Sequence, residues 1–176
     1  MNRFILSLIL AVSFLSFGCG SKESGVGLGS QSGVSNNNSG DPVETTSDCG
    51  NEKSCLMTAK INSIRQESGL VALPVYPACQ LAAQSHAEDM ALQNYFDHTG
   101  LDGSSVSDRV ARFGGDRGAG ENIAFGPDDV MVVADDMWMT SPGHRANILS
   151  AAYVGAGVGY AENSAGRSYW VQCFAQ

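Results

Sequence analysis

Apolar side chains recur at roughly helical spacing in three stretches of the chain, residues 52–68, 78–93 and 128–140. The first stretch ends at Gly69, and the third begins after Pro127 with two acids in its first turn, where a helix dipole favours negative charge. A further short helix is expected over residues 107–113, behind a serine or aspartate cap. The pattern therefore predicts four helices.

Three shorter apolar stretches predict β-strands, over residues 122–125, 155–161 and 168–174. The last two flank a cluster of turn-forming residues, 162–166, and are expected to pair as a hairpin. Helices come first along the chain and paired strands come last. This order predicts an α+β domain, with helices packed on a small antiparallel sheet.

The N-terminus carries one basic residue, Arg3, followed by a mostly apolar run over residues 4–17. The run is shorter than the about 20 residues that a membrane-spanning helix needs. It is typical of a secretory signal, and we expect a signal peptide over residues 1–18. Cys19 follows Gly18 and resembles the acylated cysteine of a bacterial lipoprotein, although Phe17 stands where a small residue is usual. Ordinary cleavage nearby, with Cys19 incidental, is the alternative.

Residues 19–48 are rich in Gly, Ser, Asn and Thr and contain almost no large apolar side chains. Such a segment buries too little surface to offset the entropy of ordering it, so we expect a lipidated N-terminus and flexible linker. Residues 49–176 would then form one domain. The net charge of −8 and the absence of any Lys/Arg run argue against nucleic acid as a partner.

Four further cysteines lie in the part of the chain that would be exported: Cys49, Cys55, Cys79 and Cys173. An even number of cysteines outside the cytosol favours disulfides over a metal site. Three pairings are possible. We favour Cys49–Cys55, which closes a short local loop, together with Cys79–Cys173, which would tie an early helix to the last strand.

Two histidines and two acids stand at or near the ends of predicted elements: His98, Glu121, Asp136 and His144. Two imidazoles and two carboxylates that met in one cleft could hold a divalent cation. Spacing alone does not bring them together, and hydrogen-bonded structural or surface histidines are the alternative. The H-E-x-x-H, G-x-S-x-G and P-loop signatures are absent from the sequence.

Four ordered motifs extend this picture: YFDHTGLDGSSVSDRV, GAGENIAFG, MWMTSPGHRANILS and VGAGVGYAENSAGRSYWVQCF. They resemble the CAP superfamily (cysteine-rich secretory, antigen 5 and pathogenesis-related 1 proteins), in its short bacterial branch, from near Leu56 to the C-terminus. The resemblance implies an α-β-α sandwich. It places His98, Glu121, Asp136 and His144 in the family's cleft, where the two histidines bind zinc or another divalent ion in some members. It also implies that Pro142-Gly143 ends the fourth helix so that His144 turns back into the cleft.

One position departs from the family pattern, because the acid two places before the helix tryptophan is usually glutamate and here is Asp136. Aspartate is one methylene shorter, which removes about 1.5 Å of reach. Direct contact with an ion on His98 and His144 is therefore not expected, although a bridging water could restore the link.

The sequence and the resemblance together predict an exported domain that binds an unidentified small-molecule, lipid or peptide ligand. We expect this domain to be anchored by lipid at the cell surface or at the periplasmic face of a membrane, or else to be secreted. We also expect it to bind one divalent metal ion, with zinc favoured. Two alternatives remain open. One is a metal-assisted hydrolase in which Glu121 or a histidine activates water. The other is lipid or sterol binding in an apolar groove, as in some family members.

Overall fold

The computed structural model describes residues 48–116 and 119–176. The expected signal peptide, the acylation site at Cys19 and the linker up to residue 47 lie outside these ranges. The elements follow in the order α1 (Glu52–Glu67), α2 (Pro77–Gln93), α3 (Val106–Arg112), β1 (Ala119–Gly126), η1 (Val132–Trp138), α4 (Pro142–Ile148), β2 (Gly155–Glu162) and β3 (Ser168–Ala175). None of the helices in the described ranges combines the length and apolar character that a membrane crossing requires.

The three strands form one antiparallel sheet in the order β1-β3-β2. β3 is central and buried along its whole length, and Gln172 at its middle pairs with Asn122 of β1 and with Val158 of β2. The predicted hairpin joins β2 to β3, with Glu162 opposite Ser168. The predicted α+β class is confirmed.

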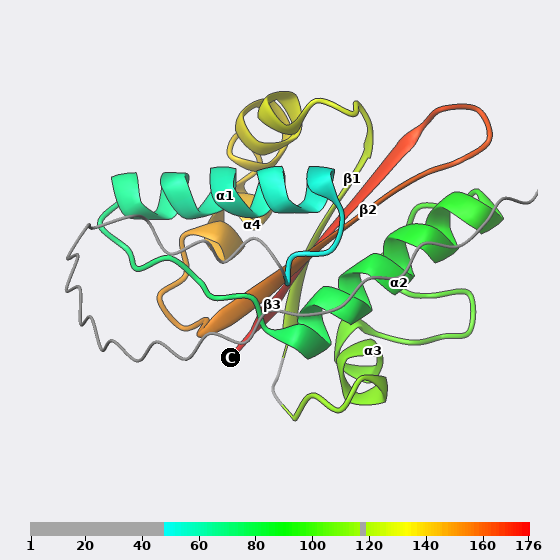
Figure 1. The fold of residues 1–176 in the computed structure, drawn as a ribbon, viewed down its shortest axis with the longest axis horizontal. Coiled ribbons are helices and arrows are strands. Elements are labelled where there is room, and N and C mark those ends of the chain that lie inside the picture. Colours follow the sequence, from blue (N-terminus) through cyan, green and yellow to red (C-terminus); the bar gives the residue numbers. More distant parts are fainter. Residues whose placement is uncertain (1–47, 117–118) are drawn as a thin grey trace, which may run out of the picture. The chain divides into compact units, whose positions relative to one another are not determined.

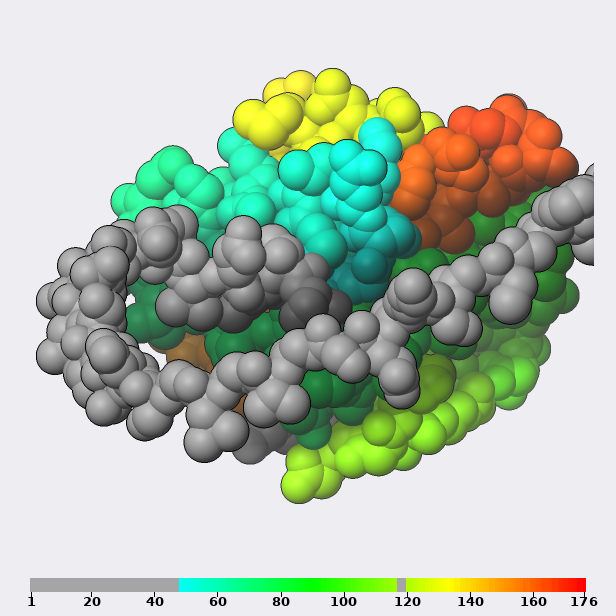
Figure 2. Space-filling model, in the orientation of Figure 1, coloured from blue at the N-terminus to red at the C-terminus, as the bar shows by residue number. Residues whose placement is uncertain are grey.

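Helices cover both faces of the sheet, because side chains on successive strand residues point to opposite faces. Trp170 and Phe174 of β3 pack into a cluster with α1, η1 and α4, whereas Val171 and Cys173 pack against α2 and α3. Figure 1 shows these two helical layers on either side of the strands. In Figure 2 the surface of the hairpin, in orange, lies between the yellow η1 segment and the green surface of α2. The result is an α-β-α sandwich.

Helix α2 approaches the outer strand β2 very closely. A Cβ atom built on Gly157 would lie 2.2 Å from the backbone nitrogen of Gln80, and one on Gly159 would lie 2.2 Å from the carbonyl oxygen of Ala83. The closeness lets the Gln80 amide donate to Val158 O at 2.8 Å and accept from Val158 N at 3.0 Å. Side chains of α2 thus satisfy backbone groups along a strand edge that would otherwise be open to pairing. Glycine at these two positions of β2 allows the close approach of the helix.

The structure pairs Cys49 with Cys55 and Cys79 with Cys173, the pairing favoured from the sequence. Cys79 on α2 and Cys173 on β3 are both fully buried. The second disulfide therefore ties a helical layer to the central strand.

Two elements differ from the sequence prediction. The expected helix over residues 128–140 is largely a π-helix, η1, in which Met139 N donates to the carbonyl of Ala134, five residues earlier, at 2.9 Å. That helix ends at Trp138, before Pro142, and Pro142 begins a new helix, α4, which also contains Gly143. Proline suits a first helical position, because its φ is already helical and it needs no N–H partner there. His144 therefore lies on a helix rather than in a turn.

Candidate functional site

The centre of the candidate site is a carboxylate held between a histidine and an arginine. Glu121 lies on β1 with 4% of its side chain exposed. Its Oε1 accepts a hydrogen bond from Nδ1 of His98 at 2.8 Å, and its Oε2 accepts from Nη2 of Arg109 at 2.6 Å. Both oxygens of Glu121 are therefore engaged, one by an imidazole and one by a guanidinium.

Arg109, on the short helix α3, also fixes the segment that carries His98. The helix begins with a capping box in which Ser105 and Asp108 bond to each other's backbone N–H groups. From this helix, the buried Arg109 side chain donates to Ser104 O at 2.9 Å and to His98 O at 3.1 Å. Arg109 was not predicted as a site residue, because its only signal in the sequence is its place in the motif YFDHTGLDGSSVSDRV.

His98 itself is 56% exposed in the loop after α2. Because a carboxylate can only accept, Nδ1 of His98 carries the proton in the bond to Glu121. The neutral ring then presents the lone pair of Nε2, for which no hydrogen-bond partner is found in residues 48–116 or 119–176. An imidazole held in this way by a carboxylate is the usual arrangement of a metal-binding histidine.

His144 lies on α4, and Nδ1 of its ring is buried without a hydrogen-bond partner in the described part of the chain. Its backbone is fixed from β1, because Asn122 Nδ2 donates to His144 O at 3.2 Å. Asn147, one turn later, donates to Glu121 O at 3.2 Å and to Asn122 Oδ1 at 2.9 Å. These hydrogen bonds from side-chain amides hold α4 against the strand that carries Glu121.

The pKa values of the two histidines are shifted in opposite directions. The pKa of His98 is raised, first by its hydrogen bond to Glu121, against the opposing effect of burial. The pKa of His144 is lowered, first by burial and then by the positive charge of His98.

Asp136 is not part of this cluster in the described contacts. Its side chain is exposed on η1, and the polar contacts found for the described residues include none between it and His98, Glu121 or His144. Within the described ranges, no group of three or more His, Cys, Asp or Glu side chains is placed to hold a metal ion. The structure thus brings His98 into contact with Glu121 and holds α4, which carries His144, against the strand of Glu121.

The opposite shifts of the two histidines can be measured by NMR. In metal-free protein, the ring-proton resonance of His98 should titrate with a pKa above the ordinary 6.5, and that of His144 with a pKa below it. The chain has three histidines, so His98→Gln and His144→Gln are both needed to assign these two signals. Two indistinguishable titrations near 6.5 would contradict the placement of Glu121 against His98 and the burial of His144.

A family model matches the part of the chain that contains this site. The family model of the cysteine-rich secretory proteins (CAP) matches residues 58–174, which include every residue of the cluster just described. The chain belongs to this family. The CAP match also agrees with the α-β-α arrangement of the described residues.

Two proteins of Bacillus subtilis (strain 168) are similar to the chain in sequence. The uncharacterized protein YkwD is 38% identical over 117 residues, which is 64% of this chain and 43% of YkwD. The uncharacterized membrane protein YlbC is 35% identical over 114 residues, which is 64% of this chain and 31% of YlbC. The chain therefore matches less than half of the length of either relative.

Two solved structures are similar in fold. An outer surface protein from Borrelia burgdorferi has a TM-score of 0.64 at 19% identity, over 71% of this chain and 92% of that one. An extracellular protein containing an SCP domain from Bacillus anthracis has a TM-score of 0.61 at 31% identity, over 69% of this chain and 39% of that one. At its low identity, the Borrelia protein supports the fold alone.

Proposed function

We propose that this CAP domain is an extracytoplasmic ligand-binding module. In this module His98 and His144 hold one divalent metal ion, for which zinc is the favoured candidate. The observation that carries the proposal is the buried, unpartnered Nδ1 of His144. Leaving a buried polar atom without a partner costs about 1–3 kcal/mol. A group that bonds to this nitrogen would recover that cost.

The donor set fits a metal held by two imidazoles. His98 presents Nε2 to the metal, and the hydrogen bond from its Nδ1 to Glu121 fixes the orientation of the ring. His144 offers its ring from α4. Zinc in proteins usually has four ligands, so two protein nitrogens leave positions for water or for a ligand of the domain. When bound, the ion would supply a Lewis acid that attracts an oxygen or nitrogen atom of that ligand.

Binding is favoured over hydrolysis by the state of Glu121. A general base needs an oxygen that is free to take a proton from water. Both oxygens of Glu121 accept strong hydrogen bonds, from His98 and from the buried Arg109. Glu121 is therefore better suited to orient His98 than to accept a proton itself.

Zinc titration of the purified protein by calorimetry tests the metal proposal. We expect one site per chain, with affinity reduced in His98→Ala and in His144→Ala by more than the about 10–100-fold cost of losing a residue that only supports a ligand. Asp136→Asn is the matched control and should bind zinc like the parent. Equal affinity in the parent and both histidine variants would remove this site from consideration.

An extracytoplasmic location is supported by the two disulfides, which persist mainly in oxidising compartments. It is also supported by the similarity to the SCP-domain protein of Bacillus anthracis, which is extracellular. We further propose that acylation of Cys19 anchors the domain to a membrane through the linker of residues 19–48.

Lipid anchoring can be tested by labelling expressing cells with a radioactive fatty acid. The parent protein should carry the label and partition into detergent, whereas Cys19→Ala should lose the label and appear in the aqueous fraction. An unlabelled parent protein would contradict the anchor and leave the metal proposal untouched.

A further inference from the structure

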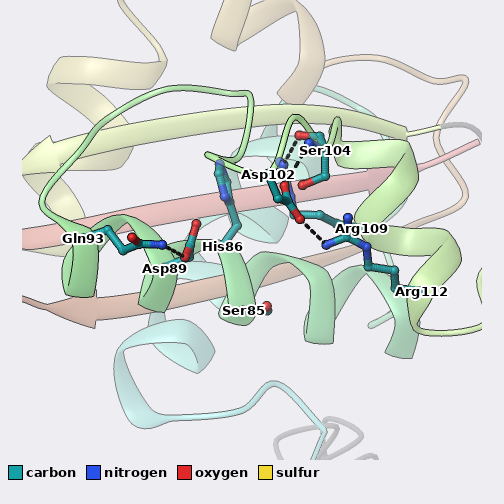
Figure 3. Close-up of a pocket in the computed structure, with 8 residues that line it drawn as sticks. All are labelled: Ser85, His86, Asp89, Gln93, Asp102, Ser104, Arg109 and Arg112. Atoms are coloured by element: carbon teal, nitrogen blue, oxygen red, sulfur yellow. Dashed lines mark hydrogen bonds and ion pairs between the residues drawn. The ribbon is translucent and has the colours of Figure 1, made fainter.

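A polar pocket that Glu121 does not line lies beside Arg109. It has a volume of about 180 Å³ and is enclosed by α2, the loop before α3, and α3 itself. Figure 3 shows Asp89 and Gln93 at one end, Arg109 and Arg112 at the other, and His86 between them. Neither His98 nor His144 lines this pocket, so it is distinct from the proposed metal site.

The end of the pocket at α2 carries a carboxylate without a cation. Asp89 accepts hydrogen bonds from Gln93 Nε2 at 2.8 Å and from the hydroxyl of Tyr95. No ion pair involving Asp89 is found in the described ranges. Its negative charge is therefore available to a positively charged group in the pocket.

The opposite end carries guanidinium groups with donors to spare. Arg109 is only 4% exposed, and its Nε atom is buried without a hydrogen-bond partner among the described residues. Arg112 uses Nη1 for Asp102 at 2.8 Å, and its side chain is 55% exposed. A guanidinium has five N–H donors, so Arg112 retains several for a ligand.

The floor between the two ends is the imidazole of His86, which is 1% exposed. Its Nε2 donates to the carbonyl of Asp97 at 2.9 Å, so Nδ1 of the neutral ring is an acceptor. Burial, the largest cause, lowers the pKa of His86 and favours this neutral form. The floor thus offers a hydrogen-bond acceptor without adding charge to either end.

This distribution of charge selects among classes of ligand. A simple anion would meet the unneutralised Asp89, and a simple cation would leave the remaining donors of Arg112 unused. A sugar site commonly offers an aromatic face for stacking, and His86 is the only ring among the residues that line the pocket. A molecule with separated positive and negative groups matches both ends. The volume corresponds to about six water molecules at ~30 Å³ each, which suits a ligand smaller than most drugs.

We propose that this pocket binds a small zwitterion of about the size of a dipeptide, with its ammonium group at Asp89 and its carboxylate at the guanidinium of Arg112. Carboxylate and guanidinium form strong, directional hydrogen bonds. The proposal does not depend on the metal site. Arg109 is the one residue that lines this pocket and also contacts Glu121.

Glycylglycine is a suitable probe, followed by ¹⁵N–¹H NMR of the full chain with a metal chelator present. We expect saturable shifts in α2, in residues 102–104 and in α3, with a Kd of about 1 mM, since a small open site gains little free energy. N-acetyl-glycylglycine, which lacks the ammonium group, and glycylglycine amide, which lacks the carboxylate, should each bind at least about 10-fold more weakly, about 1.4 kcal/mol. Equal binding of either blocked peptide would overturn the proposal.

Variants locate the two ends. Asp89→Asn should weaken glycylglycine binding about 10-fold but leave N-acetyl-glycylglycine binding unchanged, because that peptide has no ammonium group to lose its partner. Arg112→Gln should likewise weaken glycylglycine binding and leave binding of the amide unchanged.

Asp128→Asn and Arg167→Gln change the same charges outside the pocket and should bind like the parent. Dispersed amide spectra show that each variant is folded. Shifts confined to residues outside the pocket, or unchanged affinity in both pocket variants, would contradict the assignment.

Discussion

Replacing Cys79 and Cys173 together with alanine is expected to lower the free energy of unfolding by about 4–5 kcal/mol. The two residues are 94 positions apart, so the bond greatly restricts the unfolded chain. Both are fully buried where α2 packs on β3, and removing the sulfur atoms also loosens that contact. Urea denaturation followed by tryptophan fluorescence measures the loss, because Trp138 and Trp170 are completely buried in the fold.

The other disulfide provides the control for this experiment. Cys49 and Cys55 are six positions apart, and the same entropy argument gives a loss of only about 2 kcal/mol for the double alanine variant. Equal losses for the two double variants would show that chain restriction does not explain the stabilising effect of the long-range disulfide.

Glu121→Gln is expected to lower the free energy of unfolding by about 3 kcal/mol, because it leaves the guanidinium of Arg109 buried without its counter-charge. The two side chains are 5% and 4% exposed, so solvent does not screen the pair. Asp136→Asn removes an acid from an exposed position and should change stability by less than about 0.5 kcal/mol. A Glu121→Gln protein as stable as Asp136→Asn would contradict the buried ion pair.

The same substitution changes how stability depends on pH. The folded pKa of His98 is raised, so protonation of its ring stabilises the fold. This contribution is complete below the unfolded pKa of about 6.5 and is lost as the pH rises through the folded pKa. The main cause of the raised pKa of His98 is its hydrogen bond to Glu121. In Glu121→Gln the NMR pKa of His98 should therefore fall, and this part of the pH dependence should disappear. An unchanged His98 pKa would contradict the contact.

The helices and strands that pack on the core were predictable from the spacing of apolar residues. The elements that the sequence analysis missed depend on single backbone details. η1 differs from an α-helix by its wider hydrogen-bonded turn, which leaves almost no trace in the order of residue types. Pro142-Gly143 reads as a break, and nothing in the pair alone shows that a second helix begins at Pro142.

The site was predictable only in part, for a similar reason. His98, Glu121 and His144 came from a resemblance to known motifs, since spacing could not place them together. Arg109 was missed because an arginine on a short capped helix looks solvent-exposed, and only the packing of α3 beside β1 buries it against Glu121. Asp136 was also expected in the cleft; its side chain is exposed on η1, and no polar contact joins it to the other three residues in the described ranges.

Anomalous diffraction at the zinc edge, from crystals grown with zinc, shows whether His98 and His144 bind one metal ion between them. We expect one peak within bonding distance, about 2.1 Å, of a nitrogen from each ring, and no peak at that position in crystals of His144→Ala. A peak bonded to only one of the two rings, or no peak beside either ring in the parent crystals, would contradict the proposed metal site.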